Sequence, residues 1–206
     1  SLLPYLKHPD PVLRLAAARA AARLARPEDV EAFGRGLLEA ALPRGALLEV
    51  LLLLEDRSGP VLQVFLEGGG PGERWAALEA IGRLKRHDLA EGVLPFLAQP
   101  DLELKAAALR ALWRLGYPPS GHEAEILAAL LAQEEFLRVQ AVRVLPLLGE
   151  KAKRALWKRL GDPSFYVRRA AAEALKDLDP SLLAEAAQRH PDPYARAMAQ
   201  QVLREG

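Results

Sequence analysis

The residues best suited to chemistry in this chain are basic side chains interleaved with aromatic rings. Between Arg138 and Arg169 nine positions are Lys or Arg and two are acidic, while Trp157, Phe165 and Tyr166 lie among them. This composition is typical of nucleic-acid binding, in which cations meet phosphates and rings stack on bases. The net charge of the whole chain is only +1. An ordinary solvated surface therefore competes with the nucleic-acid interpretation.

Histidine is the next side chain to consider, because it binds metals and acts as a base. Cysteine is absent, and His8, His87, His122 and His190 all fall in or near predicted loops. His8 and His190 occur in the same His-Pro-Asp-Pro sequence, which indicates a repeated turn and not a metal cluster. Because threonine is also absent and serine is confined to loops and termini, an activated nucleophile is not expected. We therefore predict a protein that is not an enzyme, with no catalytic residue, metal site or cofactor.

A row of cations sets the spacing of the elements that carry these side chains. Its members recur about every thirty residues, and they are Arg14, Arg44, Arg74, Lys105, Arg138, Arg168 and Arg196. We call this set the cation row and number other positions from it. Positions +3, +6, +7 and +10 are apolar in nearly every repeat, which is the stripe of a helix about fifteen residues long. This pattern predicts a long helix, called B, in each repeat.

A shorter apolar helix, called A, precedes each helix B, and a Pro, Gly or Asp breaker separates the two. In the second repeat Pro43 and Gly45 flank Arg44, so we expect its helix B to start late. No segment alternates with a period of two, and no strand is expected. The predicted repeats are residues 1–26, 27–57, 58–86, 87–117, 118–148, 149–178 and 179–206. We predict a single all-α domain, residues 1–206, forming a right-handed α–α superhelix (an α-solenoid) of about seven antiparallel helix pairs. Its B helices would line the concave face.

The segment from Asp162 to Leu175, with its Asp-Pro turn, Val-Arg pair and Ala-rich run, resembles a HEAT-like repeat. Segments that begin at Asp10 and Asp101 resemble it more loosely. The short period is similar to that of the HEAT-like repeats of phycobilisome lyases. The resemblance implies an α-solenoid in which each row cation bridges to the turn acid of a neighbouring repeat. The acids available for this role are Asp10, Asp101, Glu134, Asp162 and Asp192.

Our leading hypothesis is a non-catalytic scaffold that binds another protein along the B helices, because the repeats are complete and catalytic groups are lacking. The predicted partner-binding residues are Trp75, Leu78, Arg110, Trp113, Arg143 and Arg168. Leu78 belongs to the apolar +4 row, which would either pack against the next helix B or form the floor of a groove. The alternative is a nucleic-acid-binding or DNA-repair module that uses the basic surface. It would be similar to HEAT-like alkylpurine DNA glycosylases by fold-level analogy alone.

The remaining expectations come from composition. Asn, Thr and Cys are absent and Arg outnumbers Lys by 21 to 7, which favours a thermophilic source. No apolar run reaches the ~20 residues of a membrane span, and we predict a cytoplasmic protein, although a removed leader is left open. The first helix A is short and the last helix B ends close to Gly206. We therefore expect either a longer parent chain or end-to-end self-association, since solenoids need polar ends.

Overall fold

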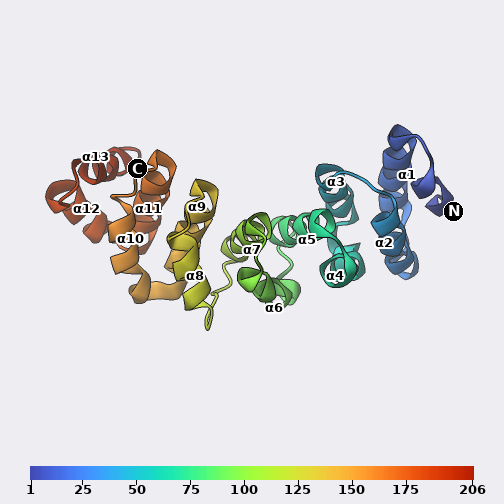
Figure 1. Ribbon diagram of the computed structural model, residues 1–206, viewed down its shortest axis with the longest axis horizontal. Helices are drawn as coiled ribbons and strands as arrows, with labels where there is room; N and C mark the ends of the chain where they lie inside the picture. Colours follow the sequence, from blue (N-terminus) through green and yellow to red (C-terminus); the bar gives the residue numbers. More distant parts are fainter. The chain divides into compact units, whose positions relative to one another are not determined.

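The computed structural model describes all of residues 1–206, and no β-strand occurs among them. The α-helices are α1 (Pro11–Leu24), α2 (Val30–Glu39), α3 (Arg44–Leu54), α4 (Gly59–Gly68), α5 (Pro71–Arg83), α6 (Ala90–Val93), α7 (Leu102–Leu115), α8 (Glu123–Leu130), α9 (Glu135–Val144), α10 (Lys153–Arg159), α11 (Phe165–Leu178), α12 (Pro180–Arg189) and α13 (Pro193–Arg204) (Figure 1). Short 3₁₀ segments precede or extend them: η1 (Leu3–Lys7), η2 (Pro27–Asp29), η3 (Glu55–Ser58), η4 (His87–Leu89), η5 (Leu94–Ala98) and η6 (Leu145–Ala152). The predicted all-α class is confirmed.

Short and long helical segments alternate along the chain as the cation row predicts. The B helices are the odd-numbered α1, α3, α5, α7, α9, α11 and α13. Two A segments differ from a regular α-helix: the first is the 3₁₀ segment η1, and the fourth is divided among η4, α6 and η5. Successive B helices contact one another, from α1 through α3 to α5 and from α7 through α9 and α11 to α13. The helix pairs therefore stack through their B helices.

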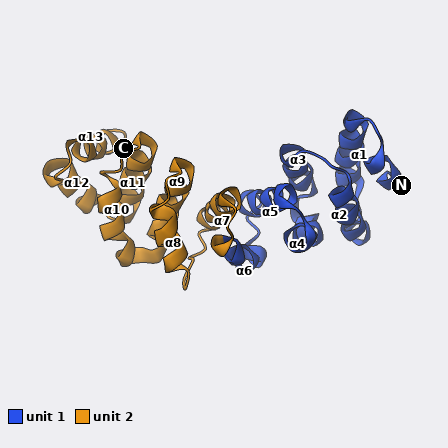
Figure 2. Cartoon of the chain, viewed as in Figure 1, with its two compact units in different colours: residues 1–96 blue, residues 97–206 orange.

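The chain divides into two compact units, Ser1–Phe96 and Leu97–Gly206 (Figure 2). The division falls within η5, in the helix A of the fourth predicted repeat. Helices α1 to α6 belong to the first unit and α7 to α13 to the second. The single continuous domain and the handedness of the superhelix stay predictions.

The apolar stripe of the B helices forms the core of each unit. Every member of the +3 row is buried, and most of these residues are alanines: Ala17, Leu47, Ala77, Ala108, Ala141, Ala171 and Ala199. Small side chains at this position let neighbouring helices approach closely. Larger residues at +7, such as Leu112 and Leu175, are also fully buried and contribute about 1.5–3 kcal/mol each.

The +4 row packs inside the units and does not form a groove floor. Its members are all buried: Ala18, Leu48, Leu78, Leu109, Val142 and Ala172. Leu78 was predicted to contact a partner, but its side chain is completely covered and cannot reach one. We therefore remove Leu78 from the partner-binding surface. Position +4 lies one residue from the centre of the stripe, so the next helix B covers it.

The start of each helix B follows from its breaker. Asp10, Asp101 and Asp192 accept hydrogen bonds from the first-turn N–H groups of α1, α7 and α13, as expected of N-cap residues. In α11 the cap is Ser164, whose hydroxyl accepts from the Val167 N–H. Helix α3 begins at its row cation Arg44, whereas α1 begins before Arg14 at Pro11. The late start predicted for the second repeat is confirmed.

Some apolar residues of the first unit remain uncovered. Val12, Leu13 and Leu24 of α1 are exposed, and Leu24 occupies position +10, which is buried at Leu54 and Leu115. The predicted end-to-end association and longer parent chain stay predictions. No helix combines the length and the apolar character needed to cross a bilayer.

Candidate functional site

The cation row holds the turn of its own repeat. Arg14 donates from Nη1 to the carbonyl oxygens of His8 and Pro9, at 2.8 and 3.1 Å. The same two bonds, to the residues six and five places earlier, are made by Arg138, Arg168 and Arg196. These carbonyls lie in the turn between helix A and helix B, where they lack partners within a helix. The arginines at these four positions therefore stabilise the turn by donating hydrogen bonds to its carbonyl oxygens.

The predicted bridge to a neighbouring turn acid forms at one junction. Arg138 donates from Nε and Nη2 to the two carboxylate oxygens of Asp162, each at 3.1 Å. Arg159 contacts the same carboxylate at 3.3 Å, and the Ser164 N–H donates to it at 2.9 Å. Burial raises the pKa of Asp162, but the bonds from Arg138 and the Ser164 N–H outweigh that effect and leave its pKa below the ordinary value. Asp10, Asp101 and Asp192 instead cap their own helices.

The two His-Pro-Asp-Pro turns are built alike. His8 and His190 each accept a hydrogen bond at Nδ1 from the N–H of the Asp two residues later, at 3.0 and 3.1 Å. His190 is buried, its Nε2 lies 3.0 Å from the Trp157 carbonyl, and its ring packs on the Trp157 ring. Because Nδ1 accepts, Nε2 carries the ring proton and donates a hydrogen bond to the Trp157 carbonyl oxygen. No group of three or more His, Asp or Glu side chains that could hold a metal ion occurs in residues 1–206.

The basic region between Arg138 and Arg169 does not form one patch. Lys153 lies 2.7 Å from Glu150 and 2.9 Å from Asp179. Arg169 pairs with Glu173 and Glu205.

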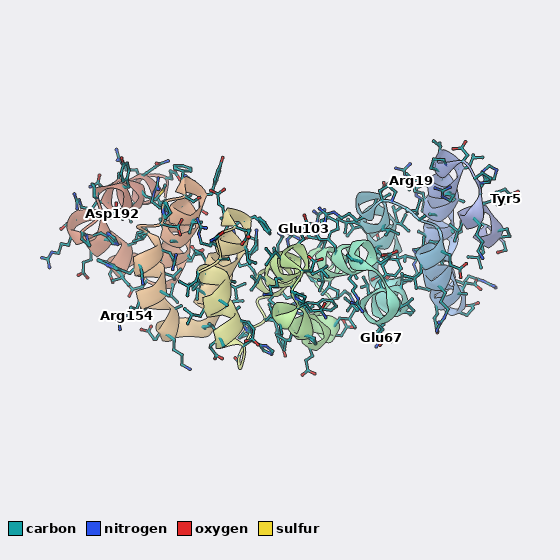
Figure 3. The ribbon with its side chains drawn as sticks, in the orientation of Figure 1. Tyr5, Arg19, Glu67, Glu103, Arg154 and Asp192 are labelled. Atoms are coloured by element: carbon teal, nitrogen blue, oxygen red, sulfur yellow. The ribbon has the colours of Figure 1, made fainter.

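The exposed cations of this region lie on helix A or next to it. Lys151, Arg154 and Lys158 are exposed, in η6 and α10, and Arg154 is labelled in Figure 3. The cations on α9 and α11 contact carboxylates, carbonyls or rings. The basic charge is thus divided between two helices and is largely used within the fold.

The structure brings together two of the predicted partner-binding residues. The Arg143 guanidinium of α9 lies 5.3 Å from the centroid of the Trp113 ring on α7, and Trp113 remains 43% exposed. Trp75 lies in the other compact unit, where Arg44 covers its ring at 4.4 Å. Arg110 is half-buried in α7. Arg168 is occupied by its turn carbonyls.

A row of exposed aromatic residues was missed by the sequence analysis. Phe136, Tyr166 and Tyr194 occupy position −2 on the consecutive B helices α9, α11 and α13, and they are 44%, 65% and 70% exposed. We call these three residues the aromatic row. Position −2 is occupied by Val12, Leu42 and Gly72 in the first unit and by Glu103 in α7. Listing position −2 beside the apolar positions would have revealed the row.

An open pocket of about 500 Å³ lies between α9 and α11. Its lining contains two members of the aromatic row and four charged residues: Glu135, Phe136, Val139, Gln140, Arg143, Tyr166, Arg169, Ala170 and Glu173. Gln140 is only 7% exposed, and its Oε1 has no hydrogen-bond partner. A buried acceptor without a partner costs about 1–3 kcal/mol. This pocket is the candidate functional site.

At the corresponding position of the first unit, an ion pair joins the two neighbouring B helices α1 and α3. Arg19 of α1 donates from Nε and Nη2 to the two oxygens of Glu49 on α3, at 2.7 and 2.8 Å. The hydrogen bond from Arg19 lowers the pKa of Glu49. Both residues occupy position +5, which on α9 and α11 is taken by Arg143 and Glu173. Arg143 and Glu173 line the pocket instead of pairing with each other.

Comparison with known proteins identifies the repeats of the second unit. Residues 123–204 match the family model described as HEAT repeats, so the HEAT-like repeat predicted at Asp162–Leu175 is confirmed in this segment. The chain is similar to the crystal structure of an engineered protein, with a TM-score of 0.51 and 17% sequence identity, over 98% of this chain and 94% of that chain. A second engineered protein aligns with a TM-score of 0.40 and 17% identity, over 98% and 96% of the two chains. No curated protein matches the chain. At such identity the likeness concerns the fold alone.

Proposed function

We propose that this chain is a non-catalytic binding protein that holds another protein on the B-helix surface of residues 97–206. HEAT repeats commonly mediate protein–protein interactions, and the matched segment contains α9, α11 and α13. The observation that carries the proposal is the aromatic row, Phe136, Tyr166 and Tyr194, exposed on these three helices. Exposed aromatic side chains are typical anchors of protein interfaces.

Trp113 and Arg143 extend the proposed surface to α7. In this pair a guanidinium lies over the face of a partly exposed indole ring, and Trp and Arg are both enriched at interface centres. Trp75 and Arg110 stay predictions as partner-binding residues. We assign Arg168 a structural role in the turn of its own repeat, because its Nη1 already donates to two carbonyl oxygens there. A cytoplasmic location and a thermophilic source also stay predictions.

The nucleic-acid alternative is the weaker explanation of the same region. Binding to phosphates requires cations that are free to replace counterions. On α9 and α11, Arg138 is bonded to Asp162 and Arg169 to Glu173 and Glu205. A nucleic acid would therefore have to displace carboxylates that these arginines already contact.

A peptide-display selection on the whole chain tests the proposal. Random peptides selected on the protein are expected to protect backbone amides of α9, α11 and α13 from hydrogen exchange. Phe136→Ala and Trp113→Ala should each weaken the selected peptides about tenfold, the effect of removing one interface anchor. Isothermal titration on each variant measures this loss.

Leu127→Ala is the matched control, because Leu127 is an exposed apolar residue on the helix A α8. It should leave the affinity unchanged. Protection centred on α8, α10 or α12, or an equal loss in Leu127→Ala, would contradict the proposal. Salt-sensitive binding of single-stranded or duplex DNA, lost in Arg143→Glu, would replace it with the nucleic-acid function.

A further inference from the structure

We propose that the pocket between α9 and α11 receives an arginine side chain from the partner protein. This inference rests on the proposed function and names the chemical group that the surface recognises. The pocket presents a buried acceptor without a partner, a carboxylate that pairs with no cation, and aromatic faces, and each of these is complementary to a guanidinium group.

Two acceptors of the pocket are not fully used by the protein itself. Gln140 Oε1 has no partner, although the residue is more than nine-tenths buried. Glu135 is exposed and accepts a hydrogen bond from the Ser164 hydroxyl at Oε2, at 2.5 Å. Its carboxylate pairs with no cation in residues 1–206. A ligand that brings several N–H donors on one planar group fits this arrangement, and arginine is the side chain that does so.

The two arginines of the pocket are already engaged. Arg169 lies between two carboxylates, 2.9 Å from Glu173 and 2.7 Å from Glu205. Arg143 lines the pocket and also contacts the Trp113 ring on α7. An anionic ligand would have to compete with these contacts. A cationic ligand finds Glu135 without a competing cation.

The aromatic row shows how an arginine can occupy this surface. Arg168 of α11 lies over the ring of Tyr194 at 5.5 Å, so the protein itself supplies a cation to the third member of the row. No guanidinium lies over Phe136 or Tyr166 in residues 1–206. Both rings line the pocket, and both are free to stack on a cation from outside.

A nuclear magnetic resonance titration of the full chain tests the inference, with acetyl-arginine amide as the probe. We expect saturable shifts in the Gln140 side-chain amide and in the backbone of α9 and α11. For so small a ligand the dissociation constant should be on the order of 1 mM. Acetyl-citrulline amide has nearly the same shape without the charge, and it should bind about tenfold more weakly.

Three variants test the roles of single groups. Gln140→Leu removes the acceptor, Glu135→Gln removes the charge, and Tyr166→Ala removes an exposed ring. Each variant should bind acetyl-arginine amide about fivefold more weakly, or weaker still. Tyr5→Ala is the matched control, because Tyr5 is also an exposed tyrosine but lies in η1 of the first unit, outside the pocket, and this variant should bind the probe as the natural chain does.

Arg143→Gln tests whether the pocket recognises a positively or a negatively charged ligand. Removing this cation from the pocket lining should strengthen binding of acetyl-arginine amide, because the ligand carries the same charge. Unchanged or weaker binding in Arg143→Gln, or equal affinity for the citrulline and arginine probes, would overturn the inference. Because Tyr166 and Glu135 are exposed, their variants remain informative even if Gln140→Leu is unstable.

The outcomes also separate this inference from the proposed function. The arginine site alone would be refuted by two results together. Selected peptides would protect α9 and α11 and lose affinity in Phe136→Ala, while acetyl-arginine amide would cause no chemical-shift change in the residues of the pocket. Peptides that avoid this surface altogether would refute the proposed function. Shifts at Gln140 with acetyl-arginine amide support the site whichever peptides are selected.

Discussion

In the second unit, two junctions between neighbouring repeats have an arginine at the same position of the cation row, but different contacts join the repeats at each junction. Arg138 and Arg168 hold the same position of the cation row, and both donate from Nη1 to two turn carbonyls. Arg138 also reaches Asp162 in the next turn. The position of Asp162 is held in the following turn by His190, and Arg168 Nε is buried without a partner.

The difference shows that a row cation has two separate roles: it stabilises the turn of its own repeat, and it can contact the next repeat. The junction at Asp162 is coupled by a buried ion pair with two arginines. The junction at His190 is coupled by a neutral ring that bonds to the Trp157 carbonyl and packs on its ring, and by Arg168 over Tyr194. A single residue, six places before the row cation, decides which kind of contact forms.

The largest effect is expected at the ion pair. Asp162→Ala leaves Arg138 and Arg159 partly buried without their shared carboxylate, and the free energy of unfolding should fall by about 3–5 kcal/mol. Urea unfolding followed by circular dichroism measures the loss. Asp192→Ala is the control, since it removes an N-cap without an ion pair and should cost about 0.5–2 kcal/mol. Equal losses in the two variants would mean that the ion pair contributes nothing beyond the bond that each carboxylate accepts from a backbone N–H.

A smaller effect is expected at the histidine junction. His190→Ala removes the bonds to Trp157 and Asp192 and should lower the free energy of unfolding by about 1–3 kcal/mol. His190→Asp should cost less, because a carboxylate keeps the bond from the Asp192 N–H and gives Arg168 Nε a partner. Thermal unfolding of both variants beside His8→Ala provides the comparison. A greater loss in His190→Asp than in His190→Ala would show that the two junctions are not interchangeable.

The smallest effect concerns acid stability at Asp179, which contacts α10 through Lys153. Bonds from the Ser181 hydroxyl, Lys153 and the Leu182 N–H lower the pKa of Asp179 from 3.8 to about 2. A folded-state pKa below the unfolded value gives stability that is present above pH 3.8 and is lost as the pH falls towards about 2. Asp179→Asn should remove this part of the acid dependence, whereas Asp177→Asn, exposed two residues away, should not. Urea unfolding across this pH window measures the slope, and identical slopes in all three proteins would contradict the assignment.

The helix pairs could be predicted closely because their signals are local. Apolar positions at a 3.6-residue period and breakers before each stripe define where a helix begins and which face it buries. The late start of α3 follows from Pro43 and Gly45 in this way. The division of the fourth helix A into η4, α6 and η5 was not predicted, although Gly92 and Pro95 lie where the α-helix is interrupted.

The candidate site was only partly visible in the sequence. Trp113 and Arg143 were both chosen, but their stacking joins residues of two different repeats and was not foreseen. Leu78 was chosen because position +4 borders the stripe, and the packing of neighbouring B helices decides that it is buried. The aromatic row could have been found from the printed sequence, since it keeps a fixed distance from the cation row.

The sequence by itself determined the spacing of the repeats, the class of the fold and the absence of cysteine chemistry. It did so because helix periodicity and N-caps depend on residues within a few positions of one another. Only the tertiary structure decided that Arg138 reaches Asp162, that Arg168 lacks such a partner, and that Gln140 lies buried without a donor. Those contacts join residues 24 or more positions apart, or leave a group without any, and the packing of one repeat on the next decides them.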